Sequence, residues 1–320
     1  MKPHPIQIHP PSIARWAPSS VAPYVHERQG PLPGPEVLIT ALVHGNEYSG
    51  AIVTNELLAS GWQPTRGRVT FAFCNVAAFD CFDAAQPDTS RLLDEDFNRV
   101  WGTARLASSQ ASLELARARQ LVPFVERATH LLDLHSMHEA AAPLWITGRL
   151  QRNIDFAQGL QTPYQVIIDN GHEDGVRMRD HGEFSNPASQ GIALLLEAGQ
   201  HWQATSVSVA KNAMFRFLVH AGAMTNSNAQ KSMAGWRLPD CTPSSPIVVT
   251  DRIVARSMDF AFTQPYSGGE VIAKAGTVIA TDSDLQIVTP YDNCVLVMPS
   301  LRQLRTGVTT VRLGQRVASP

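Results

Sequence analysis

The chain has 320 residues, of which 44% are hydrophobic and 17% are charged, enough for about two domains with a sizeable buried core. Its formal net charge of -2 gives no basic surface, which argues against nucleic acid as the main partner. No run approaches the ~20 apolar residues of a membrane helix, and residues 1–5 lack the apolar core of a signal peptide.

The four cysteines indicate the redox state of the compartment in which the protein works. Cys74, Cys81, Cys241 and Cys294 include no CxxC pair, and Cys74 falls in an apolar run typical of a core strand. Free thiols in a reducing compartment are therefore favoured over a disulfide. We expect a cytoplasmic protein without a nucleic-acid or membrane partner, and the sequence leaves open whether it forms a homo-oligomer.

Apolar and amphipathic runs alternate along the first part of the chain, after an irregular lead-in of 35 residues rich in Pro, Gly and Ser. This alternation predicts an α/β fold with a mostly parallel sheet that is flanked by helices. Ligands bind beyond the carboxyl ends of the strands in such sheets. The predicted strands are 37–43, 69–74, 131–135, 165–168 and 192–197, and the predicted helices are 48–60, 108–128 and 203–221.

The pattern changes near residue 225, where the polar run 225–230 reads as a connector. Helical periodicity ends there, and short β-like runs follow, separated by Gly and Pro. We therefore expect a catalytic domain at 1–235 and a smaller C-terminal β domain at 236–320, packed near the active site. The β-like runs are 247–250, 271–272, 278–279, 295–297 and 308–313.

His44 and Glu47 are the most informative residues of the chain. His44 directly follows the first predicted strand, and Glu47 directly precedes the first predicted helix, so both lie at one strand-to-helix corner. A spacing of three residues is close enough for both side chains to bind one ion. His135, at the end of another predicted strand, is the expected third ligand. Two His and one Glu leave a tetrahedral zinc ion one open position, which suits hydrolysis.

Two carboxylates near these ligands are candidates for supporting roles. Asp133 precedes His135 by two residues, so both leave the same face of the strand. It orients the imidazole or caps a neighbouring loop, and the sequence does not decide between these roles. Glu197 follows an apolar run, where a carboxylate is costly to bury without a purpose. We expect it to be the general base, with a structural ion pair as the alternative.

Four motifs, taken together, resemble the succinylglutamate desuccinylase/aspartoacylase family, which is related to the carboxypeptidase A-type zinc peptidases. The resemblance covers about residues 37 to 200 and extends more loosely into 295–299 and 307–313. The motifs are His44-Gly45-Asn46-Glu47, Asp133-Leu134-His135-Ser136, Asp96-Phe97-Asn98-Arg99 and Glu197-Ala198-Gly199.

The resemblance implies a role for each matching residue. His44, Glu47 and His135 correspond to the zinc ligands, and Glu197 corresponds to the catalytic carboxylate. Arg99 corresponds to the arginine that binds substrate and polarises the scissile carbonyl, with Asn98 beside it in the substrate site. Arg91 corresponds to an arginine that binds the substrate carboxylate in the aspartoacylase branch.

The chain departs from the family at two points. Pro187 occupies the approximate position of a second substrate-binding arginine, so Arg177 or Arg179 is expected to take that part from a longer loop. The family also supplies a pocket tyrosine from its C-terminal domain, for which Tyr291 and Tyr266 are the candidates.

We therefore predict a zinc-dependent amidohydrolase with one Zn²⁺ per chain. Its substrate is an N-acyl amino acid or a similar small amide that bears a carboxylate, because an arginine fork matches a carboxylate. The alternatives are a zinc carboxypeptidase that acts on a peptide end and a non-catalytic metal-dependent binding protein. Cobalt or nickel also suits the ligand set.

Overall fold

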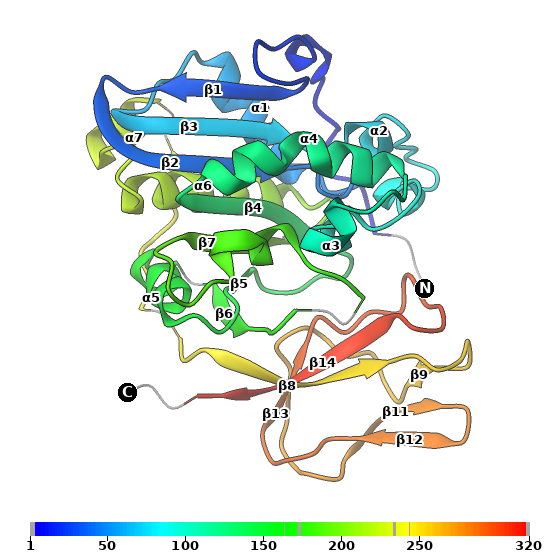
Figure 1. The fold of residues 1–320 in the computed structure, drawn as a ribbon. Helices are drawn as coiled ribbons and strands as arrows, with labels where there is room; N and C mark the ends of the chain where they lie inside the picture. Colours follow the sequence, from blue (N-terminus) through cyan, green and yellow to red (C-terminus); the bar gives the residue numbers. More distant parts are fainter. Residues whose placement is uncertain (1–3, 163, 172–173, 233–234, 243, 318–320) are drawn as a thin grey trace.

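The structure is a computed structural model that describes residues 4–162, 164–171, 174–232, 235–242 and 244–317. Helices cover a long, twisted sheet in the first part of the chain, and the last part is built of strands (Figure 1). The helices are α1 (Ser49–Ala59), α2 (Val76–Phe79), α3 (Thr103–Leu106), α4 (Leu113–Arg127), α5 (Gln151–Gly159), α6 (Ala204–His220) and α7 (Asn226–Ser232).

The described residues form an 11-stranded sheet in the order β1-β3-β2-β4-β7-β5-β6-β8-β14-β13-β10. Strands β3, β2, β4 and β7 run parallel, β1 and β5 pair antiparallel to them, and β6 returns to a parallel pairing with β5. The strands of this part are β1 (Val25–Gln29), β2 (Leu32–Ala41), β3 (Arg66–Phe73), β4 (His130–Met137), β5 (Leu144–Ile146), β6 (Gln165–Ile168) and β7 (Ile192–Gln200).

The C-terminal strands continue the same sheet. β8 pairs parallel to β6, and β14, β13 and β10 follow it in antiparallel pairings, while a separate sheet of three strands has the order β12-β11-β9 among the described residues. These strands are β8 (Ile247–Val254), β9 (Ala261–Phe262), β10 (Val271–Ile272), β11 (Val278–Asp282), β12 (Leu285–Val288), β13 (Cys294–Val297) and β14 (Thr309–Arg316). The predicted α/β class with a smaller C-terminal β part is confirmed.

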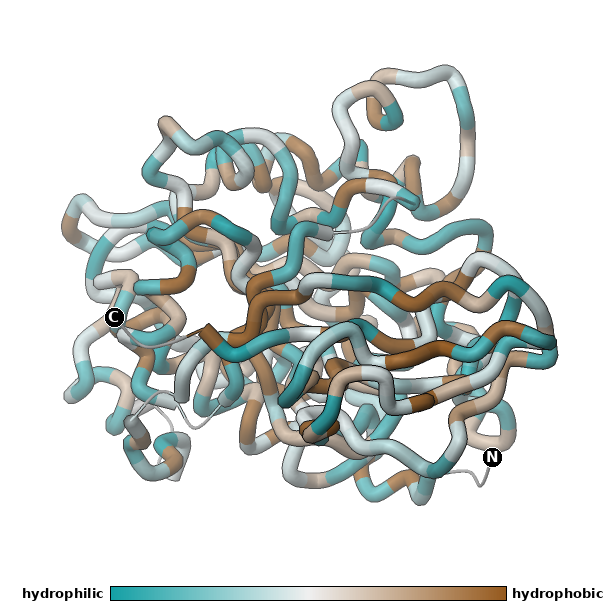
Figure 2. Tube along the Cα trace, turned by 90° about the horizontal axis from the view of Figure 1, so that it is seen from below, coloured by the Kyte–Doolittle hydropathy of each residue, from teal (hydrophilic) through white to brown (hydrophobic). Residues whose placement is uncertain are grey.

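Alternate residues of the central strands face two helical layers. On β2, Ile39 belongs to the apolar cluster with residues of α1 and α6, and Leu38 to the one with residues of α4. Because Leu131 of β4 lies in the α4 cluster, Asp133 and His135 leave that same face. Hydrophobic segments lie mainly toward the middle of the molecule, and hydrophilic ones mainly in its outer loops (Figure 2).

Several elements differ from the sequence prediction. The lead-in of 35 residues is not wholly irregular, because β1 forms in it as an edge strand in which only Val25 is buried. The predicted connector at 225–230 contains the start of α7. Among the described residues, six further α-helices and strands were not predicted because they are short or carry few apolar residues, namely α2, α3, β5, α5, β9 and β12.

The two parts of the chain share their apolar contacts. Ile247 of β8 is fully buried, pairs in register with Ile167 of β6, and belongs to one apolar cluster with Leu144 and Leu195. Beside the predicted boundary, Trp236 stacks on Phe215 of α6 at a ring distance of 5.3 Å. The division at residue 235 remains a prediction about folding units, since the sheet itself is continuous.

Ile247→Ala is expected to destabilise the first part of the chain along with the last. Truncating this buried side chain should lower the free energy of unfolding by about 2–5 kcal/mol. Five of the six tryptophans lie within residues 1–235, and Trp236 stacks on Phe215 of α6, so the midpoint of a urea titration followed by tryptophan fluorescence reports on the first part. Val288→Ala, at a 43% exposed position of β12, is the control. An unchanged midpoint for Ile247→Ala would show that the two parts unfold independently.

Candidate active site

His44 and Glu47 are positioned by a tight turn between β2 and α1. The turn begins at Leu42, a buried residue whose φ of 59° lies in the left-handed region. Gly45 packs directly on the backbone, because a Cβ at this position would lie 2.3 Å from the carbonyl oxygen of Ser90. Only glycine fits there, which explains why the motif separates its His and Glu with this residue.

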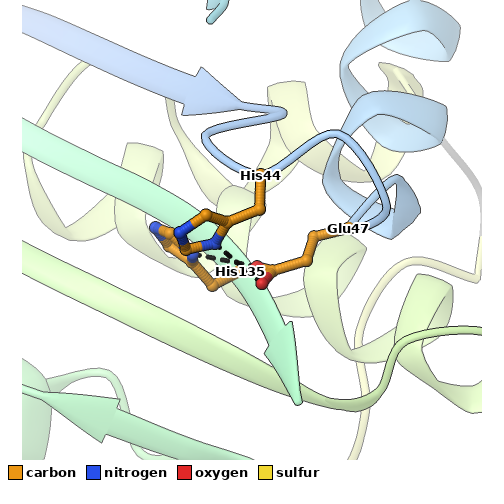
Figure 3. Close-up of side chains that lie close together, drawn as sticks. All are labelled: His44, Glu47 and His135. Atoms are coloured by element: carbon orange, nitrogen blue, oxygen red, sulfur yellow. Dashed lines mark hydrogen bonds and ion pairs between the residues drawn. The ribbon is translucent and has the colours of Figure 1, made fainter. Parts of the chain in front are cut away.

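His44, Glu47 and His135 converge at the carboxyl edge of the sheet (Figure 3). The Nδ1 atom of His44 lies 2.8 Å from one oxygen of Glu47, and the Nδ1 atom of His135 lies 2.9 Å from the other. All three side chains are buried, and their potential ligand atoms lie within 4.8 Å of one another. The structure thus brings together the three residues that the sequence predicts as metal ligands.

Carboxylates hold the opposite nitrogen of both imidazoles. Asp96 lies 3.0 Å from Nε2 of His44, and Asp133 lies 3.0 Å from Nε2 of His135. Thr40 donates a hydrogen bond of 2.7 Å to the other oxygen of Asp133, which fixes that carboxylate in turn. Carboxylates in these positions orient ligand imidazoles and raise their basicity. Asp133 therefore has the orienting role, whereas sequence reasoning gave Asp96 no role of its own.

The electrostatics of this cluster favour a bound cation. Burial opposes the ionisation of Glu47, but His44 and His135 outweigh it and hold the pKa of Glu47 well below its usual value. Burial likewise opposes the charged form of His135, but Asp133 and Glu47 raise the pKa of His135 well above its usual range. Two nitrogens and a carboxylate in this arrangement fit a divalent ion of the zinc type.

Glu197 lies on the strand next to His135. The two residues are in register across β4 and β7, so both side chains leave the same face of the sheet. Burial and then the negative charge of Glu47 raise the pKa of Glu197 to about 8. Its Oε2 atom is buried and has no hydrogen-bond partner among the described residues. A carboxylate so placed is available to exchange a proton with a bound molecule.

The structure places Arg91, Asn98 and Arg99 around this cluster in different ways. Arg91 donates a hydrogen bond of 2.8 Å to Glu47, and its Nη2 atom lies 2.9 Å from Nε2 of His44. The side-chain oxygen of Asn98 accepts a bond from the backbone nitrogen of Met178, so Asn98 supports the backbone of this loop. Arg99 donates to the carbonyl oxygen of Asn98 and forms no ion pair with the described residues. Burial lowers the pKa of Arg99 to about 10.

Of the two alternative arginines, Arg177 lines the cavity of the site and Arg179 does not. Arg179 is fully buried and donates to the carbonyl oxygens of Thr147 and Ala193, which makes it part of the core. Arg177 forms ion pairs with Asp169 at 3.2 Å and with Asp180.

The structure does not bring either candidate tyrosine to the cavity. The hydroxyl group of Tyr291 lies 2.6 Å from Thr250 Oγ1, and that of Tyr266 lies 3.0 Å from Thr263 Oγ1. Both rings are partly buried and pack against the apolar cluster of the C-terminal strands. The expectation that Tyr291 contributes to the pocket is therefore corrected.

Sequence reasoning missed Arg312 on β14. Its guanidinium group lies 3.2 Å from the same oxygen of Asp169 that pairs with Arg177, and it lines the cavity. Arg312 lies 135 residues after Arg177 and farther still from the motifs around His44, Asn98 and His135. No local sequence pattern marks it as a site residue. Only the pairing of β14 with β8 brings it to the site.

A cavity of about 450 Å³ brings together the charged and polar side chains of His44, Arg91, Asn98, Arg99, His135, Arg177, Glu197 and Arg312. The metal cluster contributes His44 and His135, and Glu197 lies beside them. The C-terminal part contributes the segment 298–300, Gln303, the segment 305–309 and Arg312, so both parts of the chain form its wall. These features define an α/β protein with a candidate metal centre in a mixed polar and apolar cavity at the carboxyl edge of its sheet.

The family model of the succinylglutamate desuccinylase/aspartoacylase catalytic domain matches residues 33–221. This is more than half of the chain, and the chain belongs to this family of deacylases. The resemblance inferred from the four motifs is thereby confirmed. No curated protein matches the chain at a significant level.

Solved structures of similar proteins have the same fold. Succinylglutamate desuccinylase from Vibrio parahaemolyticus has a TM-score of 0.62 at 19% identity, covering 92% of this chain and 87% of its own. A succinylglutamate desuccinylase/aspartoacylase from Rhodobacter sphaeroides reaches 0.66 at 16% identity, with 92% and 89% covered. The ectoine utilization protein EutE (DoeB) from Ruegeria pomeroyi, solved with its product bound, reaches 0.64 at 17%, with 91% and 88% covered.

The length and hydropathy of the helices can be compared with those of a membrane-spanning helix. Within the described ranges, none is both long and apolar enough to span a bilayer.

His135→Ala is expected to abolish binding of a divalent metal, because it removes one of three ligands from the cluster. Elemental analysis after dialysis against zinc should find about one metal per chain in the parent and little in the variant. His220→Ala, a substitution on α6 outside the cavity, is the control and should keep its metal. Full metal occupancy in His135→Ala would remove this residue from the ligand set.

Proposed function

We propose that the protein is a zinc-dependent amidohydrolase that cleaves the amide bond of an N-acyl amino acid. The observation that carries this proposal is the pairing of a His-Glu-His cluster with Glu197 on the neighbouring strand. A protein that only binds a ligand has no need of a buried carboxylate with a free oxygen beside the metal cluster. Membership of a deacylase family supports the same conclusion.

His44, Glu47 and His135 would hold the zinc ion. When bound, zinc would lower the pKa of water and polarise the scissile carbonyl group. Glu197 accepts the proton of the attacking water and returns it to the leaving nitrogen. The raised pKa of Glu197 suits the return of that proton, while the positive charge of a divalent ion favours the ionised form that accepts it.

Arg99 would stabilise the negative charge that develops on the carbonyl oxygen. It lines the cavity, and among the described residues its side chain donates to the backbone carbonyl oxygen of Asn98, so the rest of its guanidinium group can face a substrate. Donors in this role contribute about 3–4 kcal/mol in other hydrolases. Arg91 forms ion pairs with Glu47 and Asp96. We therefore propose that it both positions the candidate metal ligands and faces the substrate.

We also propose that the protein acts in the cytoplasm on a small molecule. The absence of a basic composition and the cavity of about 450 Å³ support a small carboxylate-bearing amide over a macromolecule. A peptide end is the alternative, and a panel of N-acyl amino acids and dipeptides offered to the zinc-loaded protein distinguishes the two.

Glu197→Gln tests the assignment of the base. The amide keeps the shape of the side chain but cannot accept the proton, so we expect kcat to fall about a hundredfold or more with normal zinc content. Glu139→Gln, another carboxylate of the cavity wall, is the matched control and should stay within a fewfold of the parent. Activity of Glu197→Gln near that of the parent would place the base elsewhere.

The substrate carboxylate gives a second test. Converting the α-carboxylate of the substrate to an amide should lower kcat/KM about tenfold to a hundredfold, because an arginine fork binds a carboxylate through charged hydrogen bonds. Arg91→Ala should shrink this ratio, whereas Arg305→Ala, an exposed arginine of the cavity wall, should leave it unchanged. Equal cleavage of the carboxylate and amide forms of the substrate by the parent would show that the arginines do not bind the substrate carboxylate.

A further inference from the structure

A second cavity, of about 230 Å³, adjoins the first. Both are lined by Ala141, Gly268 and Met298, so they meet at these residues. Gly268 is close to Ala141, since a Cβ on the glycine would lie 2.9 Å from the alanine Cβ. The remaining wall consists of Ala142, Leu144, Gln165, Ile167, Ile247, Gly269, Val297 and Arg316.

The register of the sheet relates this second cavity to the catalytic groups. Glu197 of β7 is paired with His135 on one side and with Leu144 of β5 on the other. Leu144 is paired in turn with Gln165 of β6. Directly paired residues leave the same face of a sheet, and neighbouring strands lie about 4.8 Å apart. The floor of the second cavity therefore begins one strand beyond Glu197, on the side away from the metal cluster (Figure 1).

This floor is apolar. Leu144, Ile167, Ile247 and Val297 are buried and belong to a single apolar cluster. Leu195 of the same cluster lines the first cavity, so one apolar cluster contributes to the walls of both cavities.

The polar groups of the second cavity are paired with one another. Arg316 donates a hydrogen bond of 3.0 Å to the side-chain oxygen of Gln165, and the side-chain nitrogen of Gln165 donates to the carbonyl oxygen of Ser245 at 3.1 Å. Arg316 also donates to that carbonyl oxygen, at 3.4 Å. The described walls thus offer a ligand mainly apolar surface.

We propose that the second cavity holds an apolar acyl chain, longer than acetyl, of the N-acyl amino acid substrate. This inference rests on the proposed function, which places the scissile amide between the metal cluster and Glu197. The arginine side of the first cavity takes the carboxylate of the amino acid, which leaves the apolar floor beyond Glu197 for the acyl group. Burying each methylene group there would strengthen binding by up to about fourfold.

The test measures binding, so that it does not depend on cleavage. The zinc-loaded Glu197→Gln protein is titrated with N-acetylglycine, N-hexanoylglycine and N-octanoylglycine by calorimetry. We expect the Kd to fall at least tenfold from acetyl to hexanoyl. Adding Ala142→Trp should remove most of that ratio, because this exposed alanine lines only the second cavity and the indole would fill it. Ala142→Ser, which hardly changes the volume, should keep the ratio.

Two outcomes would overturn the inference. They are a Kd that does not depend on chain length and a chain-length ratio that survives Ala142→Trp. Failure of the proposed function looks different, since the wild-type enzyme would then cleave none of a panel of N-acyl amino acids. Zinc content and circular dichroism of each variant show that it is folded and loaded.

Discussion

The carboxylate of Glu47 is the group on which the candidate site depends. One of its oxygens contacts His44 and Arg91, and the other contacts His135 and the backbone nitrogen of Ser136. It thereby joins the turn after β2, the loop that carries Arg91 and the end of β4. A buried carboxylate is costly unless charges and hydrogen bonds surround it, and here the same contacts that stabilise it also define the metal cluster.

A second shared carboxylate connects the two parts of the chain. Asp169, which directly follows β6, pairs with Arg177 of the catalytic part and with Arg312 of β14. Asp180 pairs with Arg177 as well, so two carboxylates hold these two guanidinium groups in place at the wall of the cavity. In the proposed reaction, the arginines of the first cavity favour an anionic group on one side of Glu197, and the apolar cluster that borders both cavities favours an uncharged group on the other.

The register of the sheet places polar and apolar side chains next to each other within one site. His135, Glu197 and Leu144 occupy paired positions on three neighbouring strands. The side chains therefore change from a candidate metal ligand to a carboxylate to an apolar wall within two strand spacings. A rigid scaffold of this kind keeps catalytic groups in place without ordering a mobile loop around them. The C-terminal strands complete the wall because β8 extends the same sheet and β14 follows it.

The sequence by itself determined the fold class, the three candidate ligands and the family. It could do so because apolar runs and local motifs carry this information, as in the strand before His44 and the apolar run 192–196 before Glu197. It failed where elements are short or polar, as for β1 and β5, whose pairing depends on neighbouring strands rather than on their own composition.

Only the tertiary structure decided which distant side chains meet. It placed Asp96 on His44, separated the cavity arginine Arg177 from the core arginine Arg179, and turned Tyr291 away from the pocket. It also brought Arg312 and the second cavity to the site. These contacts depend on strand order and register, which no single segment encodes, whereas the ligands of the metal cluster lie at strand ends that the sequence marks one by one.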